Sequence, residues 1–329
     1  MAAFAPEAIL AALTARQLIP PGSAAQLRLL HDTDGKTSHR IDPGEAPLFV
    51  KQGAPHWSQV EADIQAAVAA VLPDWTVPVL ARLPEINGFA MPFVPPDQAA
   101  PWGNTRRRLD PRVLDLTGMV ADRLGRFHAL TAGSARLEQA AEANRDRIVG
   151  MRQSFLWHSV LLAPETAPAV RRAFGSFARR TALTHGDIGF GNILTRREGV
   201  LLIDFEKSWY GDPAFDCGWM LAALIRAAIR TREPALRGLL PDAVRRAGRS
   251  WSAHVTWEDR DRAEVRAVRI ALVRCVASHR DVLDRIGKPV PPAIARDIDG
   301  VVRLVCAEPM GVAELAERLA AGGFAPADA

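Results

Sequence analysis

The chain has 329 residues, of which 48% are hydrophobic and 24% are charged, and its formal net charge is +4. This length suffices for two lobes with a large buried core, and the scattered arginines, without an aromatic-interleaved basic strip, indicate a solvated surface rather than a nucleic-acid-binding one. The sequence has no run of about 18 apolar residues that could span a bilayer. Its three cysteines form no C-x-x-C pair. The chain is therefore expected to be cytoplasmic, without disulfides or a zinc site.

Residues 1–18 lack a basic start and carry Glu7, which predicts an amphipathic helix rather than a signal peptide. Residues 24–41 predict two strands joined by a tight turn, and the polar segment that follows the turn ends at Ser38. Its hydroxyl and amide groups would suit a loop that covers phosphates. No G-x-G-x-x-G occurs here, however, and an ordinary hairpin turn accounts for the pattern equally well.

Residues 47–51 form a short apolar strand pattern that ends in Lys51, and a helical pattern over 57–72 follows it with Glu61 in the second turn. Only four of the 41 basic residues are lysine, so the chain uses arginine almost everywhere that a generic cation would do. A lysine kept at this strand end therefore indicates a specific role, because its compact ammonium is not interchangeable with a guanidinium.

The segment 76–96 predicts two strands that turn near Asn87 and run into a proline cluster, which we interpret as a hinge. We expect an N-terminal lobe over residues 1–95 and a second, helical lobe over 96–329. Amphipathic patterns predict helices in the second lobe at 114–131, 137–162, 167–180, 234–250, 257–285 and 292–320.

The stretch 185–192 reads HGDIGFGN, and an Asp-Phe pair closes an apolar strand pattern at 204–205. Phosphoryl transfer needs a carboxylate near the attacking hydroxyl and oxygen ligands for Mg²⁺ on the nucleotide phosphates. Asp187, Asn192 and Asp204 are residue types suited to those roles. The five positions between the first two allow a tight loop to turn both side chains towards one point.

This pattern resembles the aminoglycoside phosphotransferase and choline kinase-like family of small-molecule kinases. The resemblance implies an α+β, bilobal protein-kinase-like fold with a small antiparallel-sheet N-terminal lobe and a larger, mainly helical C-terminal lobe. It implies ATP or GTP and Mg²⁺ as cofactors and a small hydroxylated molecule as acceptor. It implies that Asp187 binds the acceptor hydroxyl and that His185 braces the catalytic loop. The nucleotide phosphates would be bound by Lys51, Glu61 and Ser38, the nucleotide base by Met91, Phe93, Val94 and Ile203, and Mg²⁺ by Asn192 and Asp204. Mainly structural roles are implied for Asp212 and Asp216.

The identity of the acceptor is the property that the sequence indicates least clearly. An aminoglycoside-like antibiotic or a related metabolite is the first expectation, and with it a role in antibiotic resistance. The alternatives are an amino alcohol, a sugar or a homoserine-type metabolite, or a non-catalytic regulatory protein that binds nucleotide. The acidic stretch 258–264 would suit a polycationic acceptor, but Thr256 with Asp259 as a capping box, and Glu258 with Arg262 as an i,i+4 pair, favour a capped helix start. We expect a monomer or homodimer.

Overall fold

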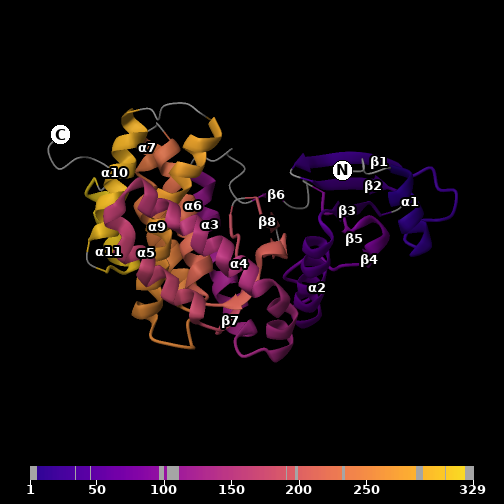
Figure 1. Ribbon diagram of the computed structural model, residues 1–329, viewed down its shortest axis with the longest axis horizontal. Helices are drawn as coiled ribbons and strands as arrows, with labels where there is room; N and C mark the ends of the chain where they lie inside the picture. The colour runs from indigo at the N-terminus through magenta and orange to yellow at the C-terminus, as the bar shows by residue number, and fades with distance from the viewer. Residues whose placement is uncertain are drawn as a thin grey trace.

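The computed structural model describes residues 6–33, 35–44, 46–95, 100–101, 111–189, 191–196, 199–231, 234–286, 292–307 and 309–322. Figure 1 shows an antiparallel sheet near the N-terminus at one end of the molecule and a large group of helices at the other. The expected fold class, a small antiparallel sheet followed by a mainly helical remainder, is confirmed. The expected lobe boundary adjoins residues 96–99, which lie outside the described residues.

The N-terminal sheet is antiparallel throughout and has five strands. In spatial order they are β1 (Gln26–Thr33), β2 (Lys36–Asp42), β3 (Leu48–Gln52), β5 (Gly88–Pro92) and β4 (Ala81–Leu83). Two helices accompany the sheet, α1 (Pro6–Ala15) and α2 (Pro55–Val71). The predicted hairpin, the Lys51 strand, the helix after it and the strand pair around Asn87 are therefore all present.

Alternation along the strands decides which side chains face the second lobe. In β3, Val50 is fully buried in an apolar cluster with residues of α1, whereas Phe49 and Lys51 are on the opposite face. Ser38 of β2 lies directly opposite Lys51, and Met91 of β5 lies opposite Phe49. The strand period thus gathers these polar and apolar side chains on one face of the sheet.

The helical part packs around a central helix, α6 (Ala214–Arg230), of which almost every residue is buried. It is in contact with α8 (Leu240–Ser252) and α9 (Arg260–Ile286), and α9 also contacts α4 (Ala135–Leu162). The remaining helices are α3 (Pro111–Thr131), α5 (Ala167–Phe174), α7 (Pro234–Arg237), α10 (Pro292–Cys306) and α11 (Val312–Ala320). None of the helices, as far as the structure describes them, is long and apolar enough to cross a membrane.

Two small sheets carry the predicted motif. One pairs β7 (Ala182–Thr184) with β10 (Trp209–Gly211), and the other has the order β6 (Ala100–Pro101), β8 (Ile193–Arg196), β9 (Gly199–Leu202). The HGDIGFGN loop therefore runs from the end of β7 to the start of β8. The Asp-Phe pair follows the end of β9.

Some predicted helix limits were wrong. The single helix expected at 234–250 is divided into α7 and α8, and the one expected at 292–320 is divided into α10 and α11. The helix after the Gly-Asp-Pro segment begins at Ala214. Asp212 accepts a hydrogen bond from the Ala214 amide at 3.0 Å, so it satisfies a free amide at the helix start.

Candidate active site

The loop after β7 is fixed by a buried carboxylate from α6. Asp216 accepts hydrogen bonds from the amides of His185 at 2.6 Å and Gly186 at 2.8 Å, and from His128 Nε2 at 3.1 Å. Trp251 Nε1 donates to His128 Nδ1 at 3.1 Å, which places the imidazole proton on Nε2. This chain of buried contacts anchors the loop backbone to the helical core, in agreement with the structural role expected for Asp216.

His185 joins the loop to the strand that carries Asp204. Its Nε2 donates to the Ile203 carbonyl at 2.8 Å, and its ring packs against Phe205 with centroids 4.8 Å apart. The next residue, Gly186, has φ +79°, and a Cβ placed there would lie 1.9 Å from the Lys207 carbonyl oxygen. Only glycine fits at this point of the loop.

Asp187 is surrounded by donors. Arg152 Nη2 of α4 lies 3.1 Å from Oδ1, Lys207 Nζ lies 2.7 Å from Oδ2, and Trp219 Nε1 of α6 donates to Oδ1 at 3.3 Å. Burial would raise the pKa of the Asp187 carboxyl, but Arg152 and Lys207 hold it well below its usual range. The carboxylate is therefore ionised at any pH at which the protein is expected to work.

Asn192 lies beside Asp187 in a way the sequence did not predict. Its Nδ2 donates to the Asp187 backbone oxygen at 2.9 Å, and its backbone carbonyl accepts from the Ile203 amide at 3.1 Å. The Asp187 carboxylate itself faces Arg152 and Lys207. Since Nδ2 is used, Oδ1 is the Asn192 side-chain atom left for a cation.

Lys51 brings together residues that are far apart in the sequence. Its Nζ lies 2.8 Å from Glu61 Oε2 of α2 and 2.7 Å from Asp204 Oδ1, which is 153 positions further along the chain. Burial would lower the pKa of Lys51, but Glu61, Asp204 and Glu206 together raise it, so the ammonium stays charged. Burial raises the pKa of Glu61, and the Lys51 ammonium opposes that shift.

Asp204 has φ +69°, a left-handed conformation that is uncommon for a residue other than glycine. Such strain persists only where the surroundings hold it, and it is frequent at active sites. Here Asp204 lies between the end of β9 and a 3₁₀ turn over Phe205–Lys207. The turn directs Asp204 and Lys207 towards the lysine of β3 and the HGDIGFGN loop.

Glu206 is a site residue that the sequence reasoning missed. It is 4% exposed, and its Oε2 lies 2.5 Å from Lys36 Nζ and 3.8 Å from Lys51 Nζ. One carboxylate oxygen from each of Glu61, Asp204 and Glu206 lies within 4.8 Å of the others. The Lys51 ammonium lies among these three carboxylates and binds Glu61 and Asp204. Carboxylate and amide oxygens are the ligands that Mg²⁺ prefers, so the second carboxylate oxygen of Asp204 and Asn192 Oδ1 are the atoms of this group suited to a divalent cation.

These residues line a cavity of about 320 Å³ between the N-terminal sheet and the small sheet of β8 and β9, a size within the usual range for small-molecule sites. Its lining includes Lys36, Thr37, Ser38, Phe49, Lys51, Glu61, Met91, Asn192, Ile203, Asp204 and Glu206.

The four residues expected at the nucleotide base are divided by the structure. Met91 and Ile203 line the cavity. Phe93 and Val94 are not among the lining residues. The Arg40 guanidinium lies 4.8 Å from the ring centroid of Phe93, and Val94 packs in the apolar cluster that also contains Phe49, Met91 and Ile203. Phe49 takes a lining position that sequence reasoning did not assign.

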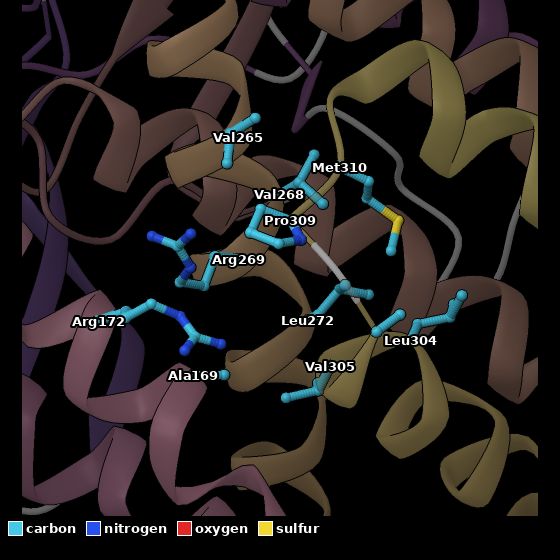
Figure 2. A pocket seen from close by; sticks show the side chains of 11 residues that line it. Ala169, Arg172, Val265, Val268, Arg269, Leu272, Leu304, Val305, Pro309 and Met310 are labelled. Atoms are coloured by element: carbon cyan, nitrogen blue, oxygen red, sulfur yellow. The ribbon is translucent and has the colours of Figure 1, made fainter.

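Figure 2 shows a second hollow, between α5, α9 and α10. Its volume is about 20 Å³, close to that of a single water molecule, and its lining is mostly apolar apart from Arg172 and Arg269. It shares no residue with the larger cavity. It is too small for a nucleotide or an acceptor.

The acidic stretch before α9 belongs to the scaffold. Asp259, rather than Thr256, caps the helix by accepting from the Arg262 amide at 3.0 Å. Glu258 pairs with Arg266 instead of the expected Arg262, and Arg266 also binds Asp212 with Nε at 2.7 Å from Oδ2. These pairs tie the start of α9 to the start of α6, so Glu258 serves the scaffold.

Comparison with known proteins identifies the family and the fold of this chain. The model of a phosphotransferase enzyme family matches residues 26–268. Among solved structures, a candidate aminoglycoside phosphotransferase from Ralstonia eutropha is 12% identical with a TM-score of 0.58, covering 98% of each chain. An ethanolamine kinase from Plasmodium vivax is 10% identical with a TM-score of 0.54, covering 97% of this chain and 88% of its own.

An amicoumacin kinase solved with AMP-PNP and Ca²⁺ is 9% identical with a TM-score of 0.55, covering 94% of this chain and 100% of its own. At such identities, these three structures share the fold with this chain. No curated protein matches the sequence.

Proposed function

The chain belongs to the phosphotransferase enzyme family, and on this premise we propose that it transfers the γ-phosphoryl group of ATP, or alternatively GTP, to a hydroxyl of a small molecule with the help of Mg²⁺. One observation carries the proposal. The Lys51 ammonium lies within 2.8 Å of both Glu61 and Asp204 at one cavity, which supports Lys51 as the phosphate-binding lysine, Glu61 as its partner and Asp204 as a metal ligand.

The residues of the N-terminal sheet would hold the nucleotide. Lys51, steadied by Glu61, neutralises the phosphates, Ser38 lies against them, and Met91 and Ile203 contact the base. Asp204 and Asn192 are the proposed ligands of Mg²⁺, which would neutralise charge on the phosphates when bound. This division makes residues 1–95 the nucleotide lobe and 96–329 the lobe that holds the catalytic loop and the acceptor.

Asp187 would accept a hydrogen bond from the acceptor hydroxyl and aim its oxygen at the γ-phosphorus. A bond forms between that oxygen and phosphorus while the bond to the departing ADP breaks. Because ion pairs hold the Asp187 pKa low, its part is to orient the hydroxyl. The hydroxyl proton is released to solvent. His185 braces the loop from behind and does not touch the reacting atoms.

The comparisons do not separate the proposed acceptors. The structural neighbours include a candidate aminoglycoside phosphotransferase and an ethanolamine kinase, so an antibiotic and an amino alcohol have equal support from the fold. A reducing, cytoplasmic setting is supported by the three cysteines, which are all free.

Asp187→Asn tests the proposal. It keeps the side-chain volume but removes the charge that orients the hydroxyl, so we expect intact nucleotide binding and a loss of transfer of at least about 100-fold. Transfer is measured as ADP release together with a gain of one phosphate by mass, across a panel of hydroxyl compounds. Asp146→Asn, at a fully exposed aspartate of α4, is the matched control and should keep wild-type transfer. Near wild-type turnover in Asp187→Asn would refute the assignment.

The rival is a regulatory protein that binds nucleotide without turnover. Two features favour it: the β1–β2 hairpin contains no glycine-rich loop, and Asp187 is already ion-paired on both oxygens. Binding of Mg²⁺ and ATP without transfer to any acceptor would decide for this rival.

A further inference from the structure

Two cations already occupy the carboxylate that would receive the acceptor. Arg152 binds Asp187 Oδ1 and also donates from Nη2 to the Gly186 carbonyl at 2.5 Å, and Lys207 binds Oδ2. The Asp187 and Lys207 side chains are 23% and 25% exposed, so solvent reaches both. Any molecule that places a hydroxyl on Asp187 must therefore place its neighbouring groups beside the Lys207 ammonium.

A third cation, Arg274 of α9, lies one layer deeper. Its guanidinium carbon is 3.9 Å from the centroid of the Trp219 ring, and the guanidinium of Arg152 is 4.6 Å from the same centroid. Arg274 Nη1 donates to the Trp219 carbonyl at 2.5 Å. The indole of Trp219, which itself donates to Asp187, thus links both arginines to the carboxylate.

Arg274 is 9% exposed and has no carboxylate partner among the described residues, and its Nε makes no hydrogen bond there. Burial and the neighbouring Arg226 lower the pKa of Arg274, and the charge of Asp187 opposes this shift. A buried guanidinium without a counter-ion is costly, and proteins rarely keep one without a use.

The local charges do not balance. Arg152, Lys207 and Arg274 contribute three positive charges that act on Asp187, and Asp204 adds a second negative charge that acts on Asp187 and Lys207. Glu206 Oε1 lies 3.6 Å from Lys207, but Glu206 is shared with the two lysines of the nucleotide side. The excess is positive on the side of Asp187 that faces α4, α6 and α9.

We propose that the acceptor is a hydroxyl compound carrying an anionic group, a carboxylate or a phosphate, which the guanidinium groups of Arg274 and Arg152 bind while its hydroxyl rests on Asp187. This rests on the proposed function and narrows it. Guanidinium groups bind both kinds of anion through charge-assisted hydrogen bonds. An ammonium group at the same place would meet like charges, so aminoglycosides and amino alcohols are disfavoured as acceptors.

Matched compounds test the class. Each set keeps one hydroxylated skeleton and changes one group: glycerate and glycerol phosphate, glycerol, and 3-aminopropane-1,2-diol, with glucuronate, glucose 6-phosphate, glucose and glucosamine as a larger set. Transfer from Mg·ATP is followed by ADP release and by product mass. We expect an anionic member to have the highest kcat/KM, by about tenfold or more over its neutral counterpart. The carboxylate and phosphate arms identify which anion is preferred.

Arg274→Met then tests the residue. We expect the KM of the anionic acceptor to rise about tenfold or more with a smaller change in kcat, and Arg274→Lys to recover part of the loss. Unchanged binding of Mg·AMP-PNP shows that these variants are folded. Arg262→Met, at an exposed arginine of the same helix, should leave all constants unchanged.

The outcomes separate the two proposals. If an amine member is the best acceptor, the anionic class is wrong while the phosphotransfer proposal stands. If the anionic acceptor keeps its KM in both Arg274 variants, the assignment of Arg274 is wrong. If no compound of any class accepts phosphate although nucleotide binds, the proposed function fails and the acceptor class fails with it.

Discussion

Glu206 contacts the ammonium groups of three lysines, and these are the only lysines among the residues that the structure describes. Nζ lies 2.5 Å away in Lys36, 3.6 Å in Lys207 and 3.8 Å in Lys51. The scarcity of lysine pointed to Lys51 from sequence alone, and the same signal applied to the other two would have found them. Glu206 gave no signal, because its partner in β2 is 170 positions away and only the fold buries it.

The ionised state of Asp187 leads to a pH prediction. An aspartate normally titrates near about 3.9, and ion pairs hold the Asp187 pKa well below that. Because the folded-state pKa is depressed, the carboxylate is ionised at every pH above the usual value. The stability from its ion pairs is lost only as pH falls through the folded-state pKa. We expect kcat/KM to show no acidic limb from Asp187 between about pH 5 and pH 7.

Lys207→Met provides the comparison, because removing one of the two cations raises the Asp187 pKa towards its ordinary value. The measurement is kcat/KM against pH for both proteins. A wild-type acidic limb that moves upward in Lys207→Met would mean that Asp187 titrates in the working range, and the prediction would fail.

Gly186→Ala tests the steric requirement of the loop. A Cβ at φ +79° would overlap the Lys207 carbonyl, so the loop or the 3₁₀ turn beside it must shift. We expect a loss of more than about 2 kcal/mol in the free energy of unfolding, measured by urea titration, and loss of transfer. Gly150→Ala, in an exposed and open position of α4, should instead gain about 0.5–1 kcal/mol. Equal effects of the two changes would contradict this account.

At the scale of elements, most strands and amphipathic helices were predictable because each buries one face with a regular period, whereas α6 is buried on nearly all sides. The prediction of helix limits failed where a helix is interrupted while the apolar period of the sequence continues. The interval between α7 and α8 contains Gly238, and the interval between α10 and α11 contains Pro309 and Gly311, so the apolar pattern continues across a break in the backbone. The acid before α9 was misassigned because its partner, Arg266, lies two helical turns away rather than one.

The start of α6 supports the loop, and Asp216→Asn tests this support. Asparagine has the same shape but only one acceptor oxygen, so at least one of the three buried donors, the amides of His185 and Gly186 or His128 Nε2, loses its partner. We expect the free energy of unfolding to fall by about 1–3 kcal/mol and transfer to fall as well. Urea titration and turnover measure the two effects, with Asp146→Asn as the neutral control. A stable variant with normal turnover would show that the loop holds its shape without α6.

At the scale of the whole molecule, the site exists only where the sheet meets the helical part. Lys36 and Lys51 come from the sheet, whereas Asp204 and Glu206 follow β9, and ion pairs join the two sides across the cavity. The sequence supplied the residue types for the motif on each side. It could not supply their distances, nor the hydrogen-bond donors around Asp187, since Arg152 belongs to α4 and Trp219 to α6, outside the HGDIGFGN loop.

The junction predicts how nucleotide and stability are linked. A ligand that binds only the folded protein at 100 times its Kd raises the free energy of unfolding by about 2.7 kcal/mol, so Mg·AMP-PNP should raise the wild-type Tm. Lys51→Met removes the ammonium that would bind the phosphates, and a tenfold weaker Kd at the same concentration leaves about 1.4 kcal/mol of that gain. Arg126→Met, at an exposed arginine of α3, should keep the full shift. An equal Tm shift in Lys51→Met and wild type would place the nucleotide elsewhere, because the variant has lost the phosphate-binding cation of β3.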